Sequence, residues 1–112
     1  MSQARTELAK ASYAAYAAGD REAIEVLIAP EFSFTSPADP QGLDRDGYFE
    51  RCWPGAGQIE EFEFVRLVEN GAEVVVTYVG TRKDGSRFRN TEVLTFAGDL
   101  QTRAEVYFGW DL

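Results

Sequence analysis

The strongest constraint on the fold is a pair of long alternating segments at the carboxyl end, from Ser86 to Leu112. In the first segment the side chains alternate between two faces, so that Glu92, Leu94 and Phe96 share one of them. Residues 97–99 then supply a tight turn, and the second segment alternates in the same way. This pattern predicts an antiparallel strand pair that places one carboxylate in an otherwise apolar row.

The second segment completes this row. Its alternation puts three apolar residues on one side: Val106, Phe108 and Trp110. A carboxylate that faces an apolar pocket loses hydration, so we expect the pKa of Glu92 to be raised unless Arg89 or another cation reaches it. Glu92 is therefore the candidate functional acid. The alternative, that Glu92 lies on an outer face or an edge and is merely solvated, stays open at this point.

Three helices are expected ahead of the long strands. An alanine-rich amphipathic helix spans Ser2 to Ala18 and stops at Gly19, and Asp20 can cap a shorter helix that runs through Ile28. Asp44 can cap a third helix. The apolar stripe of the third helix consists of Tyr48, Phe49, Cys52 and Trp53. Such a stripe either packs against a sheet or also lines a pocket, and the spacing does not choose between the two.

A short strand and a loop are expected between the second and third helices. Residues Glu31–Ser36 alternate, with Phe32 and Phe34 facing one way. Residues Pro37–Gly42 contain two prolines and a glycine, which is typical of a loop. Loops of this kind often carry functional residues, and Asp39 lies in this one.

From Ile59 onward the chain is expected to be strand, with a hairpin signal at Asn70-Gly71. The returning strand, residues 72–82, is apolar on both faces: Val74, Val76 and Tyr78 alternate with Val75, Thr77 and Val79. A sheet covered by helices on one face should be polar on the other. The second face, continued by Val93 and Thr95, therefore predicts a homodimer.

Composition excludes several kinds of site. The sequence has no histidine, so it cannot form a Ser/His/Asp triad, a histidine-rich zinc or iron site or an imidazole base. Cys52 is the only cysteine and has aromatic neighbours, so we expect a structural thiol rather than a nucleophile. The formal net charge of −8 disfavours binding to nucleic acid. We expect no metal and no cofactor.

Length and hydropathy predict one globular domain that spans residues 1–112. Hydrophobic residues make up 45% of the sequence, yet no apolar run approaches the roughly 18 residues that a membrane helix needs. The first residues lack a basic start followed by an apolar stretch, so no secretory signal is expected. We therefore expect a cytoplasmic protein without a membrane partner.

Four stretches carry a resemblance to a known family: Tyr13 to Asp20, Ile28 to Pro37, Glu92 to Asp99 and Val106 to Gly109. With its layout of three helices, a short strand and a four-stranded antiparallel meander, the chain resembles the nuclear transport factor 2-like superfamily. Within that superfamily it looks most like the SnoaL-like and ketosteroid-isomerase-like branch. The resemblance covers essentially the whole chain. It implies an α+β cystatin-like cone, in which three amino-terminal helices pack on a curved antiparallel sheet.

The resemblance also implies roles for particular residues. Glu92 falls where the isomerases hold a protonated acid in their oxyanion hole. The position of the isomerase base falls on Ser36, and a serine cannot accept a proton without an activating partner. The oxyanion tyrosine falls on Ser12, which stands beside Tyr13 and one helical turn from Tyr16. Two of the three functional positions thus depart from the isomerase pattern.

Two functions remain open. The first is an isomerase, cyclase or dehydratase that acts on a small, largely hydrophobic carbonyl compound, with Glu92, Asp39 and Tyr16 as candidate catalytic residues. The candidate ligand-binding residues are Tyr13, Ser36, Trp53, Tyr78, Phe108 and Trp110. The second is a non-catalytic module of the same fold that binds a small ligand or forms a dimeric interaction module.

Overall fold

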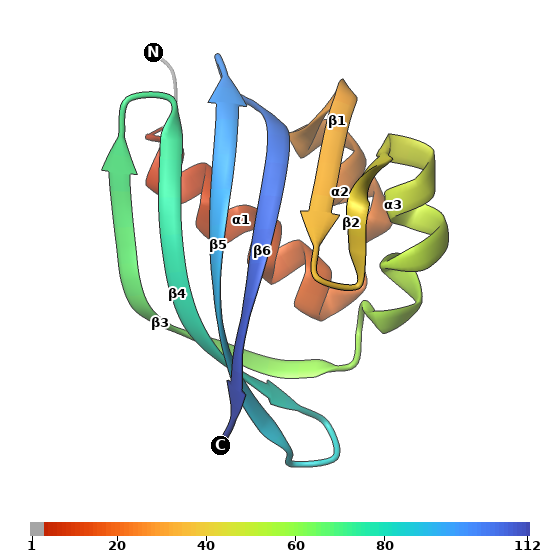
Figure 1. The fold of residues 1–112 in the computed structure, drawn as a ribbon, viewed down its shortest axis with the longest axis vertical. Coiled ribbons are helices and arrows are strands. Elements are labelled where there is room, and N and C mark those ends of the chain that lie inside the picture. The colour runs from red at the N-terminus through yellow and green to blue at the C-terminus, as the bar shows by residue number, and fades with distance from the viewer. Residues whose placement is uncertain (1–3) are drawn as a thin grey trace.

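Residues 4–112, the part of the chain that the computed structural model describes, form three α-helices packed on one face of a curved sheet (Figure 1). Residues 1–3, where the first predicted helix was to begin, lie outside the described residues. The helices are α1 (Arg5–Ala18), α2 (Arg21–Leu27) and α3 (Arg45–Arg51), and a short 3₁₀ helix, η1 (Trp53–Gly55), follows α3. This arrangement confirms the predicted α+β cone.

The sheet has six strands in the order β2-β1-β6-β5-β4-β3. Its strands are β1 (Ile28–Ser36), β2 (Asp39–Asp44), β3 (Ile59–Asn70), β4 (Glu73–Arg82), β5 (Arg87–Ala97) and β6 (Leu100–Asp111). Strands β1 and β6 run parallel, and the other neighbours are antiparallel. In the carboxyl-terminal pair Glu92 lies opposite Val106 and Leu94 opposite Ala104, so Glu92 and Leu94 share one face as predicted.

Three helix ends lie where their capping residues predict, although α2 ends at Leu27, one residue before the predicted Ile28. Gly19 closes α1 in the left-handed conformation, with φ of 68°. The carboxylate of Asp20 accepts a hydrogen bond from the backbone N–H of Ala23, and that of Asp44 accepts one from Gly47, so both cap a helix. Within residues 4–112 no helix is both long and apolar enough to cross a membrane.

The segment Pro37–Gly42, expected as a loop, is mostly strand. Only Pro37 and Ala38 form a turn, and Asp39 pairs with Ser36 at the start of β2. The prediction was wrong because β2 is an edge strand, in which a proline can occur without breaking the ladder of hydrogen bonds. The hairpin carries Asp39 back toward the interior of the cone.

A β-bulge at Gly109 changes the direction of the last side chains of β6. Asn90 pairs with Phe108 while Arg89 pairs with Trp110, so Gly109 is the extra residue between them. A Cβ atom at Gly109 would collide with the carbonyl oxygen of Arg89. The prediction that Trp110 shares a face with Phe108 is therefore wrong. Trp110 turns to the outer face of the sheet, where the guanidinium of Arg89 lies 5.5 Å from its ring centroid.

Candidate functional site

A cavity of about 480 Å³ lies between the helices and the concave face of the sheet. All three α-helices and the segment after α3 contribute to its wall, for example through Tyr13, Ile24 and Tyr48, and strands of the sheet contribute most of the remaining residues. Most of its lining is aromatic or aliphatic: Ile24, Ile28, Phe32, Phe34, Ile59, Phe62, Phe88, Leu94, Val106 and Phe108. A cavity of this size and composition suits a small, largely apolar molecule.

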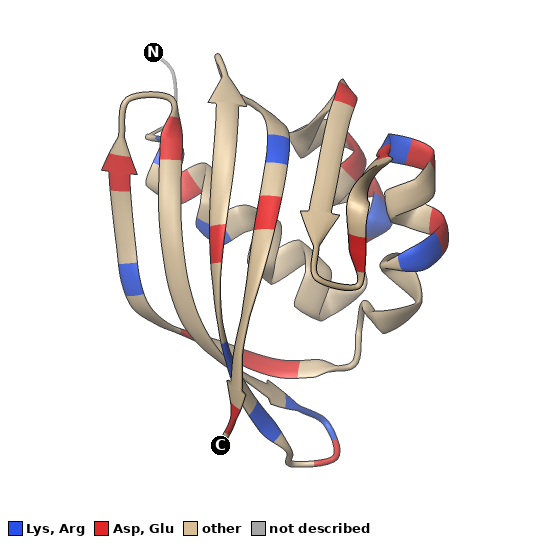
Figure 2. Ribbon diagram, in the orientation of Figure 1, with Lys and Arg blue, Asp and Glu red and all other residues tan. Residues whose placement is uncertain are grey.

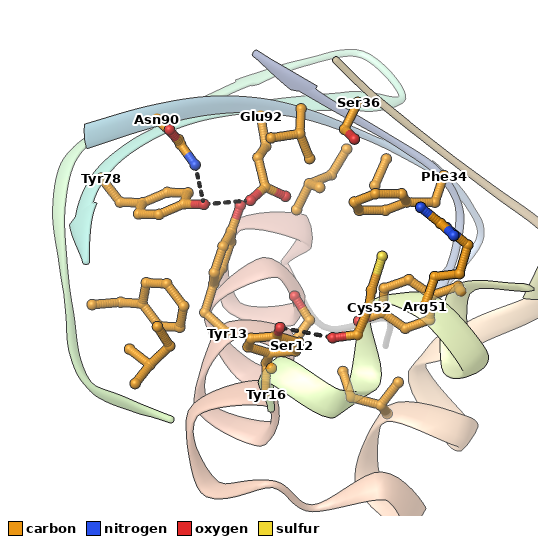
Figure 3. Close-up of a pocket in the computed structure, with 18 of the residues that line it drawn as sticks. Ser12, Tyr13, Tyr16, Phe34, Ser36, Arg51, Cys52, Tyr78, Asn90 and Glu92 are labelled. Carbon is orange, nitrogen blue, oxygen red and sulfur yellow. Dashed lines mark hydrogen bonds between the residues drawn. The ribbon is translucent and has the colours of Figure 1, made fainter. Parts of the chain in front are cut away.

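One carboxylate faces this apolar space. Glu92 projects from the middle of β5 and accepts a hydrogen bond at Oε2 from the Tyr78 hydroxyl, with an oxygen–oxygen distance of 2.7 Å (Figure 3). Tyr78 lies on β4, and its hydroxyl oxygen in turn accepts a longer bond of 3.4 Å from Asn90 Nδ2. The alternative that Glu92 lies on a solvated outer face does not hold.

Burial raises the pKa of Glu92, and the hydrogen bond from Tyr78 and a weaker interaction with the Tyr13 hydroxyl oppose this rise only in part. No lysine or arginine among the described residues forms a salt bridge with Glu92. Arg89, the cation that lies closest to Glu92 in the sequence, instead packs against Trp110 on the outer face of the sheet. Glu92 thus faces an apolar cavity without a paired cation, which is the setting in which its pKa was expected to be raised.

Tyr13 is the most unusual tyrosine in the cavity. Its ring is held by edge-to-face contacts with Phe62 and Phe64, at centroid distances of 5.1 and 5.5 Å, and it also contacts Tyr78. Its hydroxyl points toward Glu92 (Figure 3) and interacts with that carboxylate, but it forms no hydrogen bond of good geometry within residues 4–112. Burial and the neighbouring Glu92 raise the pKa of Tyr13 well above its usual range, so the hydroxyl keeps its proton.

A second polar group lies elsewhere in the cavity wall. Asp39 is 5% exposed and forms a 2.8 Å ion pair with Nε of Arg51, whose own side chain is 57% exposed. The Ser36 hydroxyl oxygen, also in the wall, accepts a hydrogen bond from the backbone N–H of Ala38. Cys52 lies nearby, and burial raises the pKa of its thiol to about 11, which leaves little thiolate near neutral pH.

Some predicted site residues take other positions. The Tyr16 hydroxyl donates a 2.9 Å hydrogen bond to the backbone carbonyl of Cys52, so Tyr16 lines the cavity but joins α1 to the end of α3. Trp53 packs on the outside of Tyr16, at a centroid distance of 5.7 Å, and does not line the cavity. Trp110 is 61% exposed on the opposite face of the sheet.

The structure also adds two residues that the sequence analysis missed. Asn90 shares the inward face of β5 with Glu92, and the same alternation that identified Glu92 could have found it. Arg51 follows from no periodicity, because only the β1–β2 hairpin brings Asp39 to it. Within residues 4–112 no group of three or more Cys, Asp or Glu side chains is placed to hold a metal ion. The absence of a cofactor stays a prediction.

The raised pKa of Glu92 predicts a pH dependence of stability. Between the unfolded pKa, about 4.3, and the higher folded pKa, the folded state binds more protons, so stability falls as pH rises through this window. Glu92→Gln removes the ionisation and keeps the shape. We expect the free energy of unfolding of Glu92→Gln, relative to that of the wild type, to increase with pH by no more than about 1.4 kcal/mol per pH unit.

Urea unfolding at a series of pH values from about 4 to about 7 measures this difference. Glu63→Gln, at an exposed position of β3, controls for the altered net charge. A difference between Glu92→Gln and the wild type that stays constant across the series would contradict the assignment of a buried acid.

Comparison with known proteins places this fold and cavity in a family. The model of the SnoaL-like domain matches residues 9–104, and no curated protein matches the chain. A proposed ketosteroid isomerase from Kribbella flavida has a similar structure, with a TM-score of 0.81 at 17% identity over 96% of this chain and 79% of that one. TerC, co-crystallised with polyporic acid, gives a TM-score of 0.75 at 20% identity, over 94% and 91% of the two chains.

A protein with a ketosteroid isomerase-like fold from Catenulispora acidiphila, in complex with trimethylamine, gives a TM-score of 0.70 at 19% identity, over 92% of this chain and 85% of that one. At these identities the structural matches show a shared fold and leave activity open. The family match covers most of the chain from α1 to β6. The chain therefore belongs to the family of SnoaL-like domains.

Proposed function

We propose that the cavity binds a small, largely hydrophobic compound through one carbonyl or hydroxyl oxygen, and that Glu92 moves a proton on this compound. The observation that carries the proposal is the Tyr13 hydroxyl, which is buried beside a carboxylate and has no hydrogen bond of good geometry in the described part of the chain. An unsatisfied buried hydroxyl is unfavourable by roughly 1–3 kcal/mol. A ligand oxygen that accepts its proton would remove this penalty.

The composition of the wall supports the same class of ligand. Aromatic side chains from β1, β3 and β5 surround the space between Tyr13 and the Asp39–Arg51 pair, and a planar apolar body would contact their faces and edges. Two proteins of similar structure have been crystallised with small organic molecules, polyporic acid and trimethylamine. That precedent supports small-molecule binding in this fold and leaves the identity of the ligand open.

The proposed chemistry is proton transfer at a carbon next to the bound carbonyl, as in an isomerase, cyclase or dehydratase. Ionised Glu92 removes the proton from this carbon, and the bonding electrons move to the carbonyl oxygen, where Tyr13 donates a hydrogen bond to the developing enolate. The protonated Glu92 then returns the proton to another atom. Its raised pKa brings the acid and base forms closer to balance near neutral pH.

The second candidate is a binding module that does no chemistry. The position that corresponds to the isomerase base holds Ser36, and the nearby carboxylate of Asp39 is tied to Arg51. The Arg51 guanidinium lies 2.8 Å from Oδ1 of this carboxylate and blocks the approach of a substrate to it. Catalysis by Asp39 would therefore require the exposed Arg51 side chain to move away.

Binding of 2-naphthol, an apolar ring system with one hydroxyl, tests the role of Tyr13. We expect Tyr13→Phe to weaken this binding about tenfold, because a hydrogen bond to a polar ligand group contributes roughly 1–1.5 kcal/mol. Naphthalene, which has no oxygen, should bind both proteins alike. Tyr107→Phe, on the outer face, is the matched control. Equal 2-naphthol affinities of wild type and Tyr13→Phe in a fluorescence titration would refute the assignment.

Exchange of the acidic C–H protons of 2-tetralone for deuterium separates an enzyme from a binding module. A positioned base typically accelerates such a step by about 10²–10⁴-fold. We expect the wild type to accelerate exchange, followed by ¹H NMR in D₂O, and Glu92→Gln to lose the acceleration. Loss in Asp39→Asn alone would transfer the base role to Asp39. No acceleration by the wild type, despite binding of 2-tetralone, would favour the second candidate.

We further propose that the outer face of the sheet forms a homodimer. Strand β4 carries no charge between Glu73 and Arg82 (Figure 2). The outward side chains of the neighbouring strands add exposed apolar surface at Val68, Tyr107 and Trp110. The outward Thr77 and Val79 of β4 are each only 6% exposed, so the exposed apolar residues lie on either side of them, on β3 and β6. Exposed apolar residues gathered on one face of a sheet are typical of an interaction surface.

The dimer can be tested by sedimentation velocity at micromolar concentration. Val79 lies on this face but is only 6% exposed, so a charge there would also disturb folding. We expect Tyr107→Glu to shift the protein toward monomer, because it places a second negative charge beside Glu105. Val26→Glu, on the exposed face of α2, should not change the oligomeric state. A monomeric wild type would refute the proposal.

A further inference from the structure

We propose that Asn90, held by the bulge at Gly109, fixes the direction of the hydrogen bond from Tyr78 to Glu92 and thereby reserves the Tyr13 hydroxyl for the ligand. Asn90 is thus a positioning residue that acts through Tyr78. The part that concerns the ligand rests on the function proposed above. The hydrogen-bond order itself is a property of the protein alone.

The order begins at the backbone of β6. The N–H of Gly109 donates a 3.1 Å hydrogen bond to Oδ1 of Asn90. A backbone N–H can only donate, so it must face the oxygen of the amide and not its nitrogen. The Asn90 side chain therefore has one orientation, with Nδ2 turned into the cavity (Figure 3).

The second step fixes the proton of Tyr78. Nδ2 of Asn90 can only donate, and it lies 3.4 Å from the Tyr78 hydroxyl oxygen, which must accept. A hydroxyl has a single proton, and here that proton is directed to Oε2 of Glu92 at 2.7 Å. The donation from Asn90 also makes Tyr78 a stronger donor, because hydrogen bonds in a chain polarise one another.

Two tyrosines beside one carboxylate thus have different roles. Tyr78 donates its proton to Glu92 in a 2.7 Å hydrogen bond, whereas Tyr13 lies beside the same carboxylate without a hydrogen bond of good geometry. Without Asn90 the Tyr78 hydroxyl could rotate and offer its proton to a ligand oxygen instead. The pair would then lose the division between a residue that orders the acid and a residue that binds the ligand.

The bulge explains why this order needs glycine at position 109. The extra residue in β6 leaves the Gly109 N–H outside the regular strand ladder, where it can meet the Asn90 side chain. Any Cβ at this position would collide with the carbonyl oxygen of Arg89. The same bulge turns Trp110 to the outer face, so one backbone feature serves both sides of the sheet.

A double-mutant cycle on the titration of Glu92 in the ligand-free protein tests the inference. The carboxyl ¹³C signal of Glu92 is followed against pH in the wild type, Asn90→Leu, Tyr78→Phe and the double variant. We expect Tyr78→Phe to raise the Glu92 midpoint and Asn90→Leu to raise it by at least about half a pH unit. In the Tyr78→Phe background Asn90→Leu should add little, because its effect passes through Tyr78.

An equal effect of Asn90→Leu with and without Tyr78 would overturn the inference, since Asn90 would then act directly on Glu92. No effect of Asn90→Leu in either background would also overturn it. If Asn90→Leu does not fold, Asn90→Asp provides the second test, because aspartate still accepts from Gly109 but cannot donate to Tyr78. The same substitution in the Tyr78→Phe background measures the effect of the added charge alone. After this effect is subtracted, we expect Asn90→Asp to raise the Glu92 midpoint only when Tyr78 is present. These titrations use no ligand, so they test the hydrogen-bond order separately from the proposed function. Either one can fail while the other holds.

Discussion

The hydrogen bond from Tyr78 to Glu92 is the interaction on which the site depends. A carboxylate inside an apolar cone loses its hydration, and no described cation compensates for that loss. The protein meets the difficulty in two ways: one tyrosine donates to the carboxylate, and the pKa rises so that protonation becomes easier. Both responses leave an acid whose charge is sensitive to what enters the cavity.

The fold supplies this interaction from strands that are distant in sequence. Strands β4 and β5 pair so that Tyr78 lies opposite Asn90 and Val76 lies opposite Glu92. This register brings the side chains of Tyr78 and Glu92 onto one face, within hydrogen-bonding distance of each other. Helix α1 then places the ring of Tyr13 over this pair. The aromatic contacts around Tyr13 fix its ring, so its free hydroxyl is part of a rigid wall and not of a mobile loop.

Alternation along the strands was enough to predict the most informative residue. Glu92 follows from its parity with Leu94 and Phe96, and the β5–β6 register agrees with that parity. Parity failed at Trp110 because a single extra residue reverses every side chain beyond it. Gly109 inside the strand was a possible sign of a bulge, but a glycine alone does not show where the register shifts. Pro37–Gly42 was wrongly expected to be a loop because composition does not reveal that a strand lies at an edge.

The choice among the tyrosines could not be made from sequence either. Tyr13 and Tyr16 lie on adjacent parts of α1, and both line the cavity. They differ in what their hydroxyls contact. Tyr16 donates to the carbonyl of Cys52 at the end of α3, and Tyr13 has no hydrogen bond of good geometry within residues 4–112. Such differences depend on distances across the cone, and no local pattern encodes them.

A crystal structure of the protein with bound 2-naphthol tests the central claim most directly. We expect the naphthol ring to lie in the cavity between α1 and the sheet. Its oxygen should lie within about 3.2 Å of the Tyr13 hydroxyl and next to Glu92, and the hydrogen bond from Tyr78 to Glu92 should be unchanged. A naphthol whose oxygen turns toward the Asp39–Arg51 pair, with the Tyr13 hydroxyl still without an acceptor, would contradict it.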